Sequence, residues 1–253
     1  MAIDLNADVG ESFGAWTLGH DEELLPLLSS VNIACGFHAG DPSVIDRTVA
    51  RAVAAGLAVG AHPGYFDLRG FGRRPQAADP AEVEQDVLYQ VGALLAFARA
   101  RGTRLRHVKP HGALYNQAAS DPRLALAVAR GTARADLGLL LVGLASSSAM
   151  REAADAVGLR FVAEAFADRR YRPDGSLTPR DQPGAVLGDP AEVAAQALAI
   201  AREGRALSAD GKPVSVRADT LCLHGEQAAA LASARAVRAA LTAADIEIRA
   251  LVP

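Results

Sequence analysis

Segments typical of strands alternate with segments typical of helices along the whole chain, about seven times over. Four of the expected helices begin with the same dipeptide, Asp-Pro, at positions 41–42, 79–80, 121–122 and 189–190. Aspartate is a favoured N-cap residue, and proline fits the first turn of a helix because its missing N–H is not needed there. Regular alternation of strand and helix is typical of a parallel α/β fold.

Hydrophobic periodicity and turn residues set the expected element boundaries. We expect strands at residues 2–8, 30–34, 57–61, 139–144, 160–165 and 219–223, a central strand that ends at Pro110, and a short last strand at 247–252. We expect helices at residues 21–28, 42–55, 80–101, 146–157, 190–204 and 226–243, with a further one that begins after Asp121. Asp174-Gly175 is expected to form a tight turn.

The chain of 253 residues has no Pro/Ser-rich linker, so we expect one domain over residues 1–253. A closed or nearly closed (β/α) barrel fits this length best. An open, doubly wound sheet is the alternative. It is less favoured because polar residues follow nearly every strand, whereas an open sheet gathers them at one switch point.

Composition excludes several classes of protein. A net charge of -3 and a pI near 6.1 give no electrostatic footprint for nucleic acid or for an acidic membrane surface. The longest apolar runs are too short to span a bilayer, and the N-terminus lacks the basic and apolar regions of a signal peptide. The two cysteines make no disulfide framework. We therefore expect a cytoplasmic protein.

The stretch at residues 106–116 concentrates ionisable side chains at the end of a strand. His107, Lys109 and His111 share one face because side chains alternate along a strand. The flanking helical patterns indicate that this strand is buried. A buried charge must be paired or used, so the stretch is either a structural ion pair or part of a site.

Other strands also end in polar residues. These are Asp8, His38, His62, Glu164, Asp168 and His224. The carboxyl ends of barrel strands meet on one face, where barrel enzymes build their active sites, so we expect these residues to converge. The chain has no P-loop, no His-Glu-x-x-His and no Gly-x-Ser-x-Gly. Hydrolysis by water, assisted by carboxylates and Lys109, is therefore favoured.

The loop at residues 65–78 is long for a simple connection and rich in glycine, arginine and aromatic residues. Loops of this length are often lids or binding loops. Arg69 and Arg73 carry guanidinium groups that can clamp a carboxylate or a phosphate. The alternative is a surface loop whose arginines pair with nearby acids.

Five motifs occur in one order along the chain, at residues 4–14, 32–42, 60–64, 108–116 and 164–171. Together they resemble the LamB/YcsF family. The resemblance implies a distorted seven-stranded (β/α) barrel similar to the glycoside hydrolase and deacetylase barrels. It also implies ring opening of 5-oxo-L-proline to L-glutamate, coupled to hydrolysis of ATP that carries Mg²⁺. Two partner subunits, B and C, of a 5-oxoprolinase complex are implied as well.

The site residues follow from this implied activity together with the strand-end pattern. We expect catalytic roles for Asp8, Glu11, Lys109, His111, Glu164 and Asp168. We expect substrate contacts from Asn6, His38, His62, Arg69, Arg73 and His224. Asp8 or Glu11 would be the base, Lys109 would meet an oxyanion or phosphate, and Arg69 or Arg73 would hold the substrate carboxylate. No resident metal is expected.

Two other functions stay open. The first is a metal-dependent hydrolase of the deacetylase type, with Asp8, His38, His62 and His111 around a divalent ion. The second is a non-catalytic regulatory subunit whose barrel mouth binds a small molecule. Metal analysis tests the first, and turnover with and without partner subunits tests the second.

Overall fold

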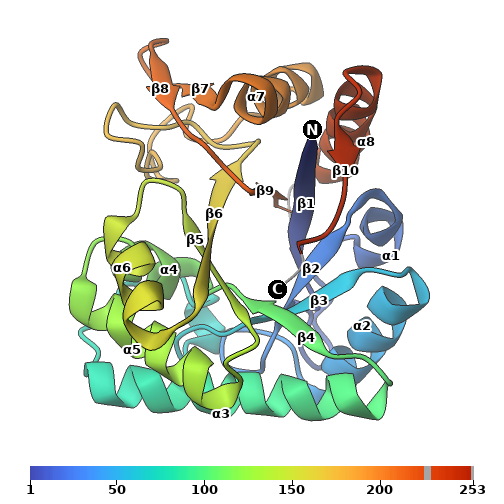
Figure 1. Cartoon of the computed structure of the whole chain (residues 1–253). Coiled ribbons are helices and arrows are strands. Elements are labelled where there is room, and N and C mark those ends of the chain that lie inside the picture. Colours follow the sequence, from blue (N-terminus) through green and yellow to red (C-terminus); the bar gives the residue numbers. More distant parts are fainter. Residues whose placement is uncertain (225–228, 252–253) are drawn as a thin grey trace.

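Parallel strands close into a barrel at the centre of the molecule (Figure 1). The computed structural model describes residues 1–224 and 229–251. The barrel strands are β1 (Ala2–Val9), β2 (Ser30–Ala34), β3 (Ala58–His62), β4 (Leu105–Val108), β5 (Leu140–Leu144), β6 (Arg160–Phe166) and β9 (Thr220–Leu223). They pair in this order, and β9 pairs with β1 to close the ring of seven. The expected seven-stranded barrel is therefore confirmed, and the open sheet is excluded.

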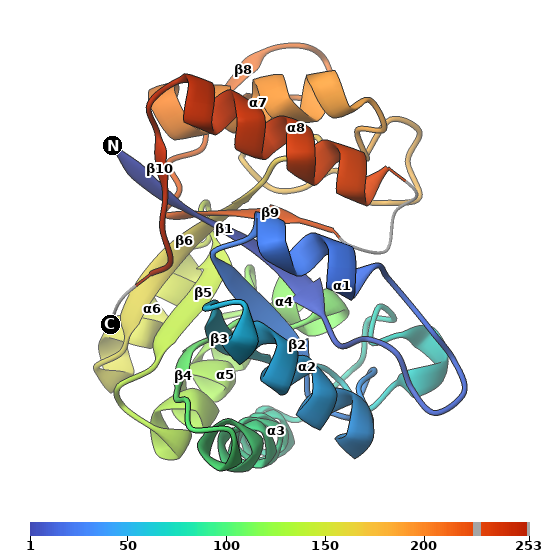
Figure 2. The ribbon, with the colours of Figure 1, turned by 90° about the vertical axis from the view of Figure 1, so that its right-hand side faces the viewer.

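Helices surround the barrel (Figure 2). They are α1 (Asp21–Leu24), α2 (Pro42–Ala54), α3 (Pro80–Ala100), α4 (Gly112–Ala118), α5 (Pro122–Ala135), α6 (Ser148–Val157), α7 (Pro190–Glu203) and α8 (Ala230–Ala243). The longest, α3, packs against α5, and α7 packs against α8. Two 3-10 turns, η1 (Leu25–Leu27) and η2 (Leu68–Gly70), complete the helical elements of the described residues.

The four Asp-Pro helix starts are confirmed. The carboxylates of Asp41, Asp79, Asp121 and Asp189 each accept a backbone N–H in the first turn of α2, α3, α5 and α7. The following proline lies in that first turn in each case. This local hydrogen bonding explains why the helix starts were readable from the sequence.

The structure differs from the expected elements in three places. The short helix α4 directly follows the central strand and was not expected. Two short strands, β7 (Arg205–Leu207) and β8 (Pro213–Ser215), form an antiparallel hairpin in a segment to which no element was assigned from the sequence. The helix expected at residues 21–28 divides into α1 and η1 around Pro26, which lacks the N–H that a continuous helix needs.

The last helix and the last strand also differ in length from expectation. The helix was expected to start at residue 226, which lies outside the described residues, and its described part begins at Ala230. The last strand, β10 (Glu247–Ile248), pairs with the start of β1 and is shorter than the expected 247–252, whose final position is not described.

Side chains alternate between the two faces of β1. On β1, Leu5, Ala7 and Val9 join the core beneath the helices, whereas Asp4, Asn6 and Asp8 bond to other residues inside the barrel. Leu251 packs on a separate apolar cluster from β5 and β6 that consists of Leu140, Val142 and Val162. Among the described residues, no helix is both long and apolar enough to cross a membrane.

Candidate active site at the barrel mouth

The ammonium group of Lys109 is the centre of a buried charge cluster. Its Nζ lies 2.9 Å from Oδ1 of Asp8 on β1 and 2.9 Å from Oε1 of Glu164 on β6. It also donates to the Sγ of Cys222 on β9 at 3.1 Å. A lysine ammonium has three N–H groups, so these three partners use all of them. The position of Nζ is therefore fixed from three strands.

Opposite charges maintain the ionised forms of Lys109 and Asp8. Burial alone would lower the pKa of Lys109, but the carboxylates of Asp8 and Glu164 raise that pKa well above its usual range. Burial would raise the pKa of Asp8, but His62 and Lys109 lower it well below its usual range. The two shifts agree in sign with a buried ion pair. The ring of Phe166 adds an aromatic face 5.4 Å from Nζ.

Amide side chains inside the barrel orient the two carboxylates. Asn32 on β2 donates to Oδ1 of Asp8 at 2.8 Å and to Oδ1 of Asn6 at 2.7 Å. Asn6 in turn donates to Oε1 of Glu164 at 3.1 Å and to the hydroxyl of Thr220 at 2.7 Å. These connected, buried hydrogen bonds restrict the orientation of both carboxylates, although Oε2 of Glu164 has no hydrogen-bond partner among the described residues.

Gly60 makes room for this network. The Nε2 of His107 contacts Oδ1 of Asn32 at 2.7 Å, which anchors the other side of that amide. A Cβ atom on Gly60 would lie 2.1 Å from the same His107 nitrogen. Only glycine can therefore occupy this position of β3 while His107 points into the barrel.

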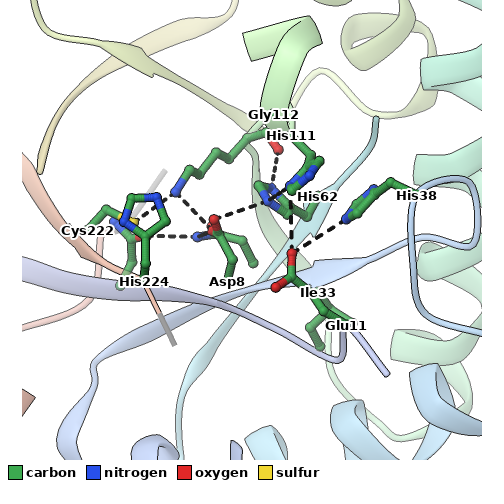
Figure 3. A network of polar contacts seen from close by, with 12 residues as sticks. Asp8, Glu11, Ile33, His38, His62, His111, Gly112, Cys222 and His224 are labelled. Atoms are coloured by element: carbon green, nitrogen blue, oxygen red, sulfur yellow. Dashed lines mark hydrogen bonds and ion pairs between the residues drawn. The ribbon is translucent and has the colours of Figure 1, made fainter. Parts of the chain in front are cut away.

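Three histidines and a glutamate form a second cluster beside Asp8 (Figure 3). The Nε2 of His62 lies 3.2 Å from Oδ2 of Asp8 and 3.0 Å from Nδ1 of His111. The Oε1 of Glu11 lies 3.6 Å from Nε2 of His38 and 3.6 Å from Nδ1 of His111. All five of these residues are buried. Burial first, and then the charge of neighbouring histidines, lowers the pKa of His38 and of His111 well below the usual range.

Asp168 and His224 form a separate pair on the other side of Asp8. The Nδ1 of His224 lies 2.8 Å from Oδ2 of Asp168, and its backbone N–H donates to the same oxygen at 3.3 Å. Burial would raise the pKa of Asp168, but the charge of His224 and its hydrogen bonds lower the pKa below its usual value. Phe166 stacks on the His224 ring at 5.4 Å between centroids.

The loop after β3 covers the histidine cluster. The Phe71 ring lies 5.1 Å from that of His111, and its carbonyl oxygen is 2.8 Å from the Nε2 of His111. The guanidinium of Arg73 lies over the Phe71 ring at 4.9 Å. Gly72 has a φ of +60°, and a Cβ there would lie 2.8 Å from both His38 and His111. The loop therefore packs directly on the site.

Other members of this loop lie elsewhere. Tyr65 is buried, whereas Phe66 is exposed and contacts Phe37 instead of the site. Arg74 pairs with Asp67 within the loop. Arg69 is exposed on the short turn η2. Among the described residues, it has no described contact with another expected site residue.

The structure thus brings most of the expected residues together. Around Lys109 and the histidines it gathers Asn6, Asp8, Glu11, His38, His62, His111 and Glu164, with the Asp168–His224 pair next to Cys222 and Asp8. Sequence reasoning missed Asn32, Cys222 and Phe166. Alternation of side chains along a strand could have identified two of them. Asn32 lies in the middle of β2, and Cys222 lies two residues before His224 and so shares its face.

Comparison with known proteins agrees with the fold and the motifs. The model of the LamB/YcsF family matches residues 3–253. The chain belongs to the LamB/YcsF family. A relative from Methylococcus capsulatus, named as the A subunit of 5-oxoprolinase, is 55% identical over 249 residues, which are 98% of this chain and 95% of the relative. A relative of the same name from Heliobacterium modesticaldum is 53% identical and covers 99% of this chain and 98% of its own.

Solved structures extend the family likeness to the fold. The crystal structure of the lactam utilization protein from Thermus thermophilus matches with a TM-score of 0.94 at 52% identity, over 99% of this chain and 100% of that one. A family 4 carbohydrate esterase from Streptomyces lividans matches with a TM-score of 0.50 at 14% identity, over 100% of this chain and 97% of that one. The second match shows only that this member of the LamB/YcsF family shares its barrel fold with that esterase.

Proposed function

We propose that this chain is the A subunit of an ATP-dependent 5-oxoprolinase, which uses water to open the lactam ring of 5-oxo-L-proline and gives L-glutamate, ADP and phosphate. The names of the relatives support the class of reaction, a hydrolysis of a lactam. The single observation that carries the proposal here is the buried cation of Lys109, held by Asp8 and Glu164 at the carboxyl ends of the barrel strands.

The chemistry of a lactam explains why such a site is suitable. An amide carbonyl is a poor electrophile, and ring opening of 5-oxoproline is unfavourable without coupling. Phosphorylation of the amide oxygen by ATP, which releases ADP, would make the ring carbon open to attack by water. The ring C–N bond would then break as the nitrogen takes up a proton, which leaves an acyl phosphate, and a second water would release phosphate and L-glutamate. The site must then offer a base, a cation for the developing negative charge, and a group that holds the substrate carboxylate.

The residues of the mouth can be assigned to these roles. Lys109 would stabilise the oxyanion or the transferred phosphate, because a preorganised buried cation loses little energy by reorganising. Asp8 or Glu11 would accept the proton of the attacking water, since both contact the histidine cluster and both are acidic. Arg73 would hold the substrate carboxylate, because it lies over Phe71 at the edge of the covering loop.

ATP and its Mg²⁺ would act as co-substrate, together with partner subunits B and C. The sequence has no P-loop motif. Binding of the nucleotide would therefore be shared with the partner subunits. The relatives are named as one subunit of an enzyme, which agrees with assembly into a larger complex.

The test is an assay of 5-oxoproline with Mg-ATP, with this chain alone and mixed with subunits B and C. We expect equal amounts of glutamate and phosphate from the complete mixture, and no turnover when this chain is left out. Lys109→Met should lower turnover of the complete mixture by roughly 100-fold or more. Glutamate formation at an unchanged rate without this chain, or with Lys109→Met, would contradict the proposal.

A further inference from the structure

Four buried donor atoms converge beside the Lys109 cluster. They belong to Glu11, His38, His62 and His111, and all of them lie within 4.8 Å of one another. Each residue reaches the point from a different segment: the end of β1, the loop after β2, the end of β3 and the start of α4. Figure 3 shows His38 and His111 directed toward the carboxylate of Glu11, whereas His62 is directed toward Asp8.

Three of the donor–donor distances are close to those around a tetrahedral metal ion. Bonds of about 2.0–2.2 Å to nitrogen and oxygen put neighbouring donors of a tetrahedral site roughly 3.3 Å apart. In this cluster, Nε2 of His62 and Nδ1 of His111 are 3.0 Å apart, and Oε1 of Glu11 is 3.6 Å from both His111 Nδ1 and His38 Nε2. These three distances are close to that value, and the other pairs of donor atoms lie within 4.8 Å.

Backbone carbonyls leave a lone pair on the facing nitrogens. The Nδ1 of His62 lies 2.8 Å from the carbonyl oxygen of Lys109, and the Nε2 of His111 lies 2.8 Å from that of Phe71. A carbonyl oxygen only accepts, so both of these nitrogens carry hydrogen. In neutral rings, His62 Nε2 and His111 Nδ1 then face each other as two acceptors. A backbone carbonyl bonded to the far nitrogen is the usual partner of a metal-binding histidine.

A proton alone does not satisfy the cluster. An extra proton on His62 Nε2 could bond to His111 or to Asp8. That proton would not give His38 a hydrogen bond. Neither ring nitrogen of His38 has a hydrogen-bond partner among the described residues. His38 is fully buried, and its Nε2 faces the carboxylate of Glu11. A buried imidazole nitrogen without a partner is costly, and a cation bound at Nε2 would remove the cost at that nitrogen.

We propose that Glu11, His38, His62 and His111 bind one divalent transition-metal ion of the zinc class. Three imidazoles and one carboxylate favour such ions over Mg²⁺ or Ca²⁺, which prefer oxygen ligands. This differs from the ligand set considered from the sequence, because Asp8 faces Lys109 and Glu11 takes its place. It also replaces the expectation that the barrel holds no resident metal.

Binding of the ion has one structural consequence. The rings of His38 and His111 are stacked in parallel, with centroids 3.7 Å apart. The lone pair of an imidazole nitrogen lies in the plane of its ring, so two stacked rings cannot both point at one ion. The proposal therefore requires the ring of His38 to rotate out of the stack, which changes its present distance of 3.6 Å from Oε1 of Glu11. With Glu11 as a ligand, Asp8 is left as the base of the proposed lactam hydrolysis.

The first experiment measures metal content by mass spectrometry of purified full-length protein, expressed in medium supplemented with zinc. We expect about one ion per chain in the wild type. Glu11→Gln and His38→Gln should each weaken binding by at least ~100-fold, because loss of a direct ligand costs no less than loss of its supporting partner. The matched control is His20→Gln, the same substitution at an exposed histidine outside the cluster, which should retain the ion.

The second experiment uses Co²⁺, whose visible absorption distinguishes tetrahedral from octahedral sites. Wild type expressed with cobalt should show the intense bands of a tetrahedral site, and folded His38→Gln should not. Circular dichroism confirms that each variant is folded, and Glu11→Gln serves if His38→Gln is not. Wild type without bound metal, or with the same metal content as a folded ligand variant, would overturn the proposal. Both readouts are independent of 5-oxoprolinase turnover.

Discussion

Lys109 and Glu164 meet across the interior of the barrel, with 2.9 Å between Nζ and Oε1, although their strands are separated in the ring by β5. Asp8 on β1 contacts the same ammonium, also at 2.9 Å. One cation thus holds two carboxylates together in a water-poor environment. Removal of either partner leaves an uncompensated buried charge, which is much costlier than the loss of a surface ion pair.

Lys109→Met should therefore destabilise the fold as well as lower activity. We expect the free energy of unfolding to fall by about 3 kcal/mol or more, because Asp8 and Glu164 would repel each other without the ammonium. The measurement is equilibrium unfolding in urea. The double variant Lys109→Met/Glu164→Gln should recover part of the loss, since it removes one of the two charges. A double variant less stable than the single one would contradict this explanation.

The Asp168–His224 pair predicts how stability depends on pH. The pKa of Asp168 is lowered in the folded state, so its contribution is fully present above the unfolded value of about 3.9. The contribution is lost as the pH falls through the lower, folded pKa. We therefore expect Asp168→Asn to be less stable than wild type at pH 5.5, with the difference shrinking below about pH 4. The measurement is the free energy of unfolding of wild type and Asp168→Asn from pH 5.5 to pH 3. A difference between them that stays constant over this range would refute the prediction.

Gly60→Ala should disturb the interior amide network. The new Cβ would lie 2.1 Å from the His107 ring, so the ring must move away from Asn32. Overpacking of this kind costs about 1–3 kcal/mol, and we expect at least the upper part of that range. Gly92→Ala is the matched control, because Gly92 lies in α3 with no atom near its would-be Cβ. That control should stabilise the chain by up to about 1 kcal/mol. Equal unfolding midpoints for both variants would refute the prediction.

Arg73→Lys tests the covering loop in the complete 5-oxoprolinase assay. Lysine keeps the charge but loses the planar, two-pronged donor group, so a carboxylate clamp should weaken. We expect the KM for 5-oxoproline to rise about tenfold with little change in melting temperature. Arg69→Lys is the control and should give near-wild-type kinetics, since Arg69 lies on η2 and, unlike Arg73, has no described contact with Phe71 or another site residue. Unchanged kinetics for Arg73→Lys would remove Arg73 from substrate binding.

Local features were predictable from the sequence because their causes lie within a few residues. The carboxylate of Asp41 accepts hydrogen bonds from N–H groups in the first turn of α2. Asp-Pro therefore marks the start of this helix independently of what the helix packs against. Alternation along β1 placed Asp4, Asn6 and Asp8 on one face, and the structure has all three inside the barrel. The family motifs indicated the closed barrel and the region of the site.

Only the tertiary structure decided which of these groups touch. Lys109 and Cys222 are 113 residues apart, and Asn6 and Thr220 are 214 apart, so no local pattern records their contact. Register between paired strands and closure of β9 onto β1 set these distances, and both depend on packing of the whole chain. The same holds for the cluster of Glu11 with three histidines, whose donors come from four separate segments. Sequence determined the elements and the kinds of side chain at their ends, whereas barrel closure determined the chemistry that they can perform together.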